Sequence, residues 1–166
     1  MKHVLLARVQ DHPGVLNRVA SLFRRRAFNI DSLTVGASES KGFSRMTIVV
    51  DATRTSARLV AANLGKLVAV EEVMDVTHLP TIARDLALIR VRCSPEERGP
   101  LHDLVAGFRA RVADVGSDSV IVEAAGTEED LDSLVALLRP RGVLEIVRTG
   151  RVAMVRGNGN GNGPVS

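Results

Sequence analysis

The chain has 166 residues, of which 45% are hydrophobic, so it can form one ordinary domain or two small ones. Its 22 basic and 19 acidic residues leave a formal charge of only +3, and four Phe with no Tyr or Trp leave little to stack bases on, so the composition argues against nucleic-acid binding. The single cysteine, Cys93, excludes an internal disulfide and favours a cytoplasmic protein, and the short N-terminal apolar run is typical of neither a signal peptide nor a membrane span.

The first half of the chain alternates apolar runs with amphipathic stretches in the order βαββαβ. The predicted elements are a strand over 3–10, a helix over 14–27, strands over 30–37 and 43–51, a helix over 54–67 and a strand over 70–77. The small polar residues and two glycines of 36–42 suit a hairpin loop, and Thr53 is the predicted N-cap of the second helix.

After Pro80 the same order is predicted a second time. The elements are a strand over 86–93, a helix over 95–110, strands over 112–115 and 120–125, a helix over 128–138 and a strand over 143–149, with residues 151–156 as an added edge strand. Both helices carry apolar side chains at i, i+3, i+4 and i+7 spacing, which is typical of one buried helix face.

The repeated order predicts an α+β fold of two ferredoxin-like βαββαβ domains, each with both helices on one face of a four-stranded antiparallel sheet. The predicted domains are residues 1–79 and 80–156, and the Gly- and Asn-rich tail at 157–166 is expected to be disordered. The sheet face away from the helices needs cover, so we expect an oligomer.

The predicted helices differ in the charge at their N-termini. Ser94 and Thr127 each precede carboxylates, Glu96 and Glu97 in one case and Glu128 to Asp130 in the other, so both helix starts can be capped by their own side chains. The first helix instead begins within DHPGVL, where the only acid comes before the proline. The backbone N–H groups predicted to be free there are those of Gly14, Val15 and Leu16.

A helix N-terminus with free N–H groups favours an anion, and a glycine lets that anion approach the backbone closely. Asp11 and the Asn29 amide can face the ammonium and carboxylate of a small zwitterion, beside an apolar wall from Val15, Leu16 and Ile30. This combination describes a pocket for a small aliphatic amino acid. The alternative is that Asp11 is itself the N-cap and the Pro-Gly corner is an ordinary tight turn; spacing alone does not decide between them.

The run DHPGVLNRVASLFRRRAFNIDSLTVG, followed by SRMTIVV, resembles the regulatory (small) subunit of acetolactate synthase, also called acetohydroxyacid synthase. Its DHPGVL start is similar to the ligand loop of the ACT domain, a regulatory module that binds amino acids. The resemblance is closest over the first half of the chain and continues in the pattern of DLALIRVRC, AAGTEEDLDSLVALL and EIVRTGRVAMVRG.

The resemblance implies an N-terminal ACT domain and a subunit with no catalytic site of its own. Such a subunit binds the large catalytic subunit, raises its activity and confers feedback inhibition by valine in branched-chain amino acid biosynthesis. The partner is expected to use thiamine diphosphate, Mg and FAD, and this chain to bind no cofactor. The effector is expected between the ACT domains of a homodimer, with these residues carried over by motif: Asp11, His12, Gly14, Val15 and Leu16 from one chain, and Asn29 and Ile30 from its neighbour.

The sequence leaves several questions open. The effector can be valine, leucine or isoleucine, because one methylene changes binding by only about 1 to 3 kcal/mol. Glu96 and Glu97 would repel a ligand's carboxylate, so no second effector site is predicted at their helix. The alternative function is a stand-alone ACT-type sensor that regulates another enzyme or transcription. An RNA-binding module has the same element order but needs aromatics on its central strands, where only Phe43 is available. An enzyme is the least favoured class, since the chain shows neither a nucleophile–base pairing nor ligand spacing among its four histidines.

Overall fold

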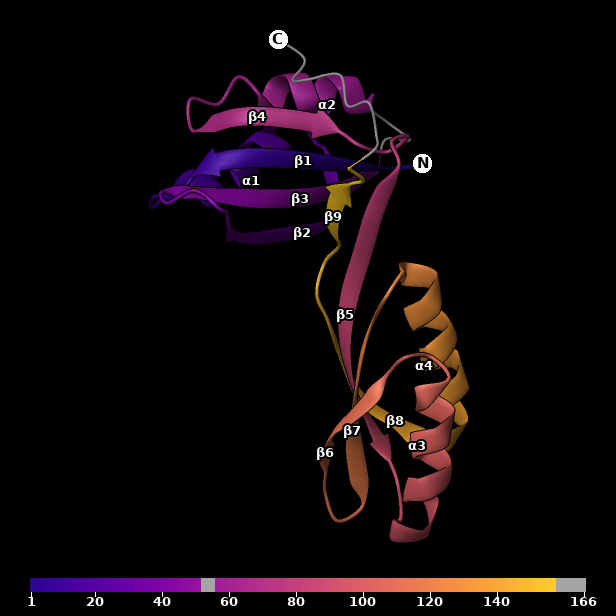
Figure 1. Ribbon diagram of the computed structural model, residues 1–166. Coiled ribbons are helices and arrows are strands. Elements are labelled where there is room, and N and C mark those ends of the chain that lie inside the picture. The colour runs from indigo at the N-terminus through magenta and orange to yellow at the C-terminus, as the bar shows by residue number, and fades with distance from the viewer. Residues whose placement is uncertain (52–55, 158–166) are drawn as a thin grey trace. The chain divides into compact units, whose positions relative to one another are not determined.

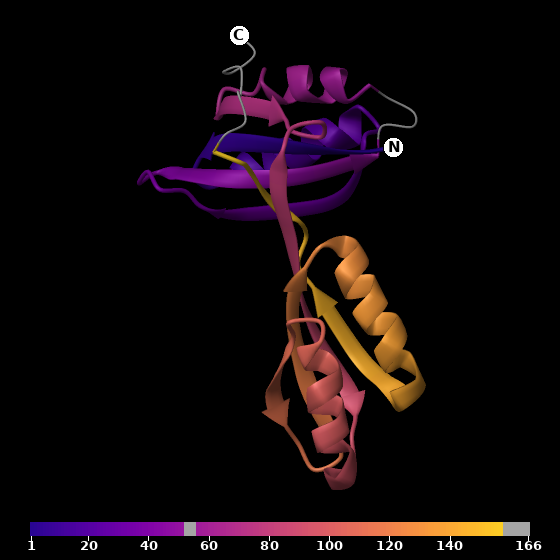
Figure 2. The ribbon, with the colours of Figure 1, turned by 45° about the vertical axis from the view of Figure 1, so that its right-hand side comes forward.

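The computed structural model describes residues 1–51 and 56–157, and the chain divides into two compact units. The first unit comprises Met1–Ile82 together with the chain from Arg151 onward, and the second comprises Ala83–Gly150. Each unit has its own antiparallel sheet and its own pair of α-helices (Figure 1, Figure 2).

The first unit contains a four-stranded sheet of order β2-β3-β1-β4 with all neighbours antiparallel. Its elements are β1 (Lys2–Gln10), α1 (Val15–Arg25), β2 (Asn29–Ala37), β3 (Phe43–Asp51), α2 (Ala57–Leu64) and β4 (Val70–Asp75). Lys2 pairs with Asp51 and Gln10 with Phe43, so β1 and β3 run side by side over their whole length. Strands β2 and β4 are the two edges of this sheet.

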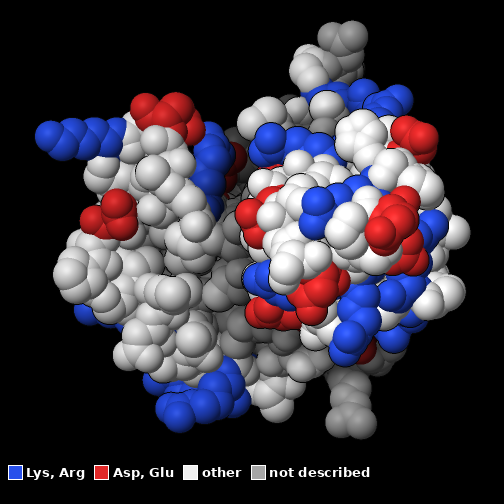
Figure 3. Space-filling model, turned by 90° about the horizontal axis from the view of Figure 1, so that it is seen from below, with Lys and Arg blue, Asp and Glu red and all other residues white. Residues whose placement is uncertain are grey.

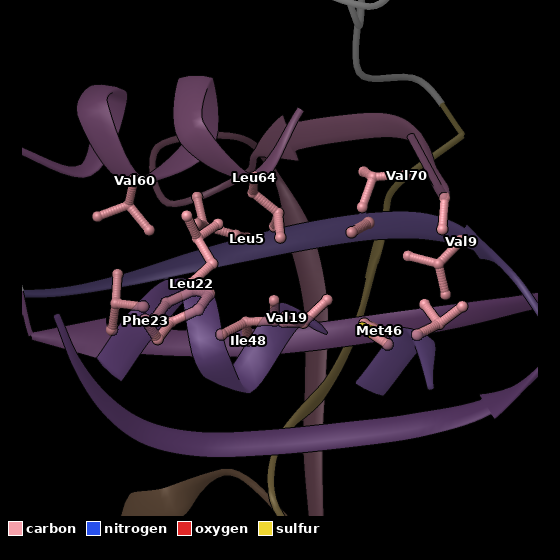
Figure 4. Close-up of a cluster of buried hydrophobic side chains, with 14 residues drawn as sticks. Leu5, Val9, Val19, Leu22, Phe23, Met46, Ile48, Val60, Leu64 and Val70 are labelled. Atoms are coloured by element: carbon pink, nitrogen blue, oxygen red, sulfur yellow. The ribbon is translucent and has the colours of Figure 1, made fainter. Parts of the chain in front are cut away.

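The core of the first unit lies between the sheet and its two helices (Figure 4). Every second residue of β1 and β3 contributes to it, because side chains of a strand alternate between the two faces. The helical stripe predicted for α1 supplies Val19, Leu22 and Phe23, and α2 supplies Val60 and Leu64. Full burial of such side chains stabilises a fold by about 1.5 to 3 kcal/mol each, so this packing holds α1 in place over the sheet.

The second unit repeats this arrangement with a sheet of order β6-β7-β5-β8. The second half of the chain forms β5 (Thr81–Arg92), a 3-10 turn (Pro95–Glu97), α3 (Arg98–Ala106), β6 (Arg111–Val115), β7 (Ser119–Gly126), α4 (Glu128–Gly142), β8 (Val143–Arg148) and β9 (Val152–Val155). Its core combines inward residues of β5 and β7 with the apolar stripes of α3 and α4, and Cys93 is buried in it.

Strand β9 pairs with β5, so the added edge strand expected at 151–156 is present, but only over Val152–Val155. The backbone amide of Arg156 donates to the Pro80 carbonyl at 2.8 Å. By its contacts, the described chain from Arg151 groups with the first unit. The domain roles attached to residues 1–79 and 80–156 stay a prediction.

The predicted α+β fold of two βαββαβ units is confirmed, and the differences lie at element ends. Strand β5 begins at Thr81, earlier than expected, and the helix expected over 95–110 is a 3-10 turn followed by α3, which ends at Ala106. The second helix begins at Ala57 with Ser56 as N-cap, whose hydroxyl accepts from the Leu59 amide. Thr53, the predicted cap, and the tail from residue 158 lie outside the described residues.

In Figure 3, basic and acidic residues lie side by side on one part of the face shown, and another part carries few charges. Within residues 1–51 and 56–157, no helix has both the length and the apolar character needed to cross a membrane.

Candidate functional site

The corner between β1 and α1 is a tight turn that ends in a left-handed glycine. Gly14 has φ 92° and ψ −13°, and the Val15 amide donates to the His12 carbonyl at 3.4 Å. Proline at the second position and a positive φ at the third are the features of a type II turn, which explains the Pro-Gly sequence. A Cβ at Gly14 would have no atom within 4 Å, so the glycine is required by its backbone conformation and leaves open space above it.

Helix α1 begins without any side-chain cap. Gly14 is its N-cap, no side chain accepts a hydrogen bond there, and the first turn contains no acidic residue. Within the described chain, the amides of Gly14 and Leu16 have no backbone acceptor. The Val15 amide has one, but its 3.4 Å distance to the His12 carbonyl is long for a hydrogen bond. The start of α1 therefore presents unsatisfied donors and the positive end of the helix dipole to solvent.

Asp11 does not cap the helix, which decides one question that the sequence left open. Its side chain is exposed and makes no hydrogen bond to any described residue. The His12 imidazole is also exposed and lies 3.1 Å from the Pro13 carbonyl, through its Nδ1. Both side chains are thus available at the rim of the corner, and neither occupies the start of α1.

The corner is held by two backbone hydrogen bonds that the sequence did not reveal. The Gln10 amide donates to the Ala69 carbonyl, and the Asp11 amide donates to the Gly42 carbonyl, both at 2.8 Å. Gly42 has φ 85° and ends the β2–β3 hairpin loop, so the hairpin and the corner form one connected backbone surface. The small polar residues and two glycines of 36–42 predicted this hairpin loop, but nothing in the sequence indicated which segment the Gly42 carbonyl would contact.

The apolar residues of the first turn have different environments. The Val15 side chain is 4% exposed and belongs to the core, so Val15 offers its backbone to the corner, whereas the Leu16 side chain is 49% exposed. Leu16 is therefore the apolar side chain that the first turn of α1 presents at the surface.

Asn29 and Ile30 lie far from the corner within one chain. Asn29 pairs with Asp51, whose partner on β1 is Lys2, while the corner follows Gln10 at the other end of β1. A strand rises about 3.3 Å per residue, so the length of β1 separates the two places by about 25 Å. One chain brings Asp11, His12, Gly14, Val15 and Leu16 together and leaves Asn29 and Ile30 at the opposite end of the sheet.

The helix starts of the second unit carry their own acceptors, as predicted. The Ser94 amide donates to the Glu97 carboxylate at 2.9 Å, and at α4 the Thr127 amide donates to Asp130 Oδ2 at 3.0 Å while the Asp130 amide donates to Thr127 Oγ1 at 3.1 Å. The hydrogen bond from the Thr127 backbone lowers the pKa of Asp130, and the one from Ser94 is among the causes that lower the pKa of Glu97. Helix α2 also lacks an acidic first turn but is capped by the Ser56 hydroxyl, whereas the start of α1 has neither a carboxylate nor a side-chain cap.

An exposed ion pair joins two residues of the hairpin that holds the corner. The Arg45 guanidinium donates to both carboxylate oxygens of Glu39, at 3.1 Å from Nε and 2.9 Å from Nη2. These hydrogen bonds lower the pKa of Glu39 to about 2. The carboxylate is therefore charged at any pH at which the corner would meet a ligand.

Comparison with known proteins gives consistent similarities over almost the whole chain. The family described as "AHAS small subunit-like ACT domain" matches residues 5–72, and the family described as "Small subunit of acetolactate synthase" matches residues 84–157. A probable acetolactate synthase small subunit of Archaeoglobus fulgidus is 48% identical over 158 residues, which cover 95% of this chain and 99% of that protein. The acetolactate synthase small subunit of Bacillus subtilis is 39% identical over 95% of this chain and 92% of its own length.

A solved structure shows the same fold. The crystal structure of the acetolactate synthase small subunit from Thermotoga maritima superposes with a TM-score of 0.87 and 38% sequence identity, covering 95% of this chain and 99% of that one.

Proposed function

Because this chain belongs to the family of acetolactate synthase small subunits and has an N-terminal ACT domain, we propose that it activates the catalytic subunit and makes it sensitive to inhibition by valine. Family membership makes it the regulatory, non-catalytic subunit of the holoenzyme. In this proposal the large catalytic partner carries thiamine diphosphate, Mg and FAD, this chain carries none of them, and the assembly works in the cytoplasm.

The observation that carries the proposal is the uncapped start of α1. An amino acid has a carboxylate that can accept from the Gly14 and Leu16 amides, where the structure supplies no acceptor among the described residues. Its ammonium group can face the exposed Asp11 carboxylate, and its aliphatic side chain can lie against exposed Leu16. The corner thus offers one complementary group for each part of a small apolar zwitterion.

A homodimer formed through β2 would supply Asn29 and Ile30. Strand β2 is an edge of its sheet, and two copies related by a two-fold axis pair antiparallel through such an edge. If the axis passes near Leu33, Asn29 of one chain lies opposite Ala37 of the other, at the end of the sheet where β1 runs into the corner. The separation of about 25 Å within one chain therefore supports a site shared by two chains.

Regulation follows from the shared site by linkage. An effector bound between two chains favours the dimer arrangement in which both halves of the site meet, and it shifts the catalytic subunit only by its difference in affinity between two states. Couplings of about 1 to 3 kcal/mol are ordinary for such systems.

Calorimetric titration of valine into the holoenzyme or the full chain tests the effector site. We expect binding by the natural chain and none by Gly14→Asp, because the new carboxylate would occupy the position of the ligand's carboxylate. Gly14→Asn is the matched control. Its side chain has nearly the size and shape of Asp and must adopt the same positive φ, but it carries no charge. Valine binding by Gly14→Asp equal to that of Gly14→Asn would show that the anion position is wrong.

The partner is tested by copurification with the large subunit of acetolactate synthase and by the rate of acetolactate formation. Complex formation with a raised rate, lowered again by valine, is the expected result. A chain that binds valine but leaves the large subunit unaffected would instead fit a stand-alone sensor.

A further inference from the structure

The second unit contains a cavity that the proposed effector site does not use. It has a volume of about 470 Å³ and lies where the end of α3, the end of β7 and the first turns of α4 meet. The residues that give it its chemistry are Arg84, Phe108, Arg109, Asp130, Leu131 and Leu134. All of them belong to the second unit.

Arg109 stands in an unusual backbone position at this cavity. It has φ 55°, and the Ala110 amide beside it donates to the Val105 carbonyl at 3.1 Å, which closes α3 in the manner of a Schellman motif. Glycine is the usual residue there. The first unit has the same closure after α1, with Ala27 at φ 53°, so the turn belongs to the repeated fold. The two turns differ in their side chains: the left-handed residue is Ala27 in the first unit and Arg109, with its guanidinium group, in the second.

The two cavity arginines have no acidic hydrogen-bond partner among the described residues. Arg84 donates through Nη1 to the carbonyl of its own neighbour, Ala83, at 2.7 Å, and Arg109 makes no side-chain hydrogen bond. The Asp130 carboxylate is close enough for both arginines to lower its pKa, after the larger effect of the Thr127 hydrogen bonds. Since Asp130 already accepts from the Thr127 amide, the cavity has two cations, one engaged anion and a net charge of +1.

Apolar side chains also line the cavity. Leu131 and Leu134 are fully buried members of the second core, and partly buried Phe108 packs against the same core. An occupant of this cavity therefore needs an anionic group for the arginines and a short aliphatic part for the leucines. A zwitterion is less suitable than a simple anion, because its ammonium group would oppose the net positive charge.

We propose that this cavity binds a small aliphatic monocarboxylate without an ammonium group, such as a branched 2-oxo acid, with its carboxylate on Arg84 and Arg109 and its hydrocarbon part against Phe108, Leu131 and Leu134. The site is separate from the uncapped start of α1 and extends the ligands of this chain beyond amino acids. Guanidinium groups suit this role because they can donate two parallel hydrogen bonds to one carboxylate.

Methyl NMR spectra of the full chain test the proposal with 3-methyl-2-oxobutanoate as the probe. This compound has the carbon skeleton of valine without the ammonium group, so the two ligands form a matched pair. We expect the oxo acid to shift the methyl resonances of Leu131 and Leu134, and valine to shift those near Gly14. Acetate, which lacks the branched chain, is expected to bind the cavity at least tenfold more weakly, because apolar burial contributes to affinity.

Arg109→Gly tests the role of the guanidinium without disturbing the fold. It removes the guanidinium and places glycine at a left-handed position, so folding should be unharmed while affinity for the oxo acid falls about tenfold or more. Ala27→Gly makes the same backbone change at the matching turn of the first unit and should leave oxo-acid binding unchanged.

Three results would overturn the proposal: no shift at Leu131 and Leu134 with millimolar probe, equal affinity in Arg109→Gly and the natural chain, or equal affinity for acetate and the oxo acid. Each result is independent of the effector proposal, which is tested by valine and Gly14→Asp. A chain that loses one kind of binding can retain the other.

Discussion

At the scale of single residues, the corner depends on backbone groups more than on side chains. The Gly14 conformation opens the start of α1, and the Gly42 carbonyl fixes the corner through the Asp11 amide. Substitutions that spare these two glycines should change the rim of the site without moving it. The side chains that matter for the frame lie in the hairpin, where Glu39 and Arg45 pair.

The Glu39–Arg45 pair predicts a specific pH response. Because the pKa of Glu39 is lowered from 4.5 to about 2, its contribution to stability is fully present above pH 4.5 and is lost as the pH falls through about 2. Carboxylate NMR titration of Glu39 should give a midpoint near pH 2. In Arg45→Gln the midpoint should return toward 4.5, and an unchanged midpoint in that variant would show that Arg45 is not the cause.

At the scale of secondary-structure elements, the N-terminal caps distinguish α1 from the helices of the second unit. Thr127 and Asp130 satisfy two backbone donors of α4 reciprocally, and Glu97 does the same for the Ser94 amide before α3. These helices are complete without any ligand. Helix α1 has no such cap and is held by the packing of its apolar side chains in the core.

Loss of the α4 cap should be measurable as stability. Thr127→Ala removes the hydroxyl that accepts from the Asp130 amide, which costs about 1 kcal/mol of unfolding free energy for a typical N-cap. Thr127→Ser keeps a hydroxyl at the same atom position and should lose much less. Urea denaturation of both variants checks this, and an equal loss in the two would mean that the hydroxyl is not what stabilises α4.

Element types were predictable because each apolar pattern has a clear period, as at Val19, Leu22 and Phe23 on α1. The carboxylates at the starts of α3 and α4 were also predictable, because a cap involves only residues that are close together in sequence. The long-range features were not. The Asp11–Gly42 bond joins segments about 30 residues apart in sequence, and the extension of β5 to Thr81 depends on pairing with β9.

The cavity near Arg109 also lay beyond the reach of the sequence. It brings together residues from β5, the turn after α3, β7 and α4, and no local pattern marks Arg84 and Arg109 as neighbours. The positive φ of Arg109 is equally hidden, because glycine is the residue that signals such a turn in sequence.

At the scale of the whole molecule, the exposed edge of β2 is the surface that the proposed dimer uses. Val35 lies on this strand with 41% of its surface exposed. An apolar residue on an open edge strand favours pairing with another strand, whereas lysine at such an edge opposes it.

Val35→Asp should therefore weaken the dimer. With the two-fold axis near Leu33, the new carboxylate would lie opposite Asp31 of the other chain, and like charges directly opposite each other destabilise a strand pair. Sedimentation equilibrium should show a larger monomer fraction, and valine affinity should fall with it, since the partner's Asn29 and Ile30 would be lost from the site. Val68→Asp, at a residue that is 89% exposed outside the strands, is the control and should change neither quantity. A full-strength dimer in Val35→Asp would mean that the subunits associate through another surface.

The two halves of the chain share one architecture. In the second unit, Glu97 and Asp130 supply a carboxylate at the start of a helix, whereas the start of α1 has none. In the second unit that anion is covalently part of the chain, so it is present at an effectively constant, high local concentration and its effect never varies. In the proposed effector site the anion comes from solution, so the free energy of unfolding of the first unit would rise with effector concentration, by about 2.7 kcal/mol at one hundred times the dissociation constant. The cap of α4 therefore contributes the same stability at every effector concentration, whereas the proposed ligand at α1 would make the stability of the first unit depend on the supply of effector.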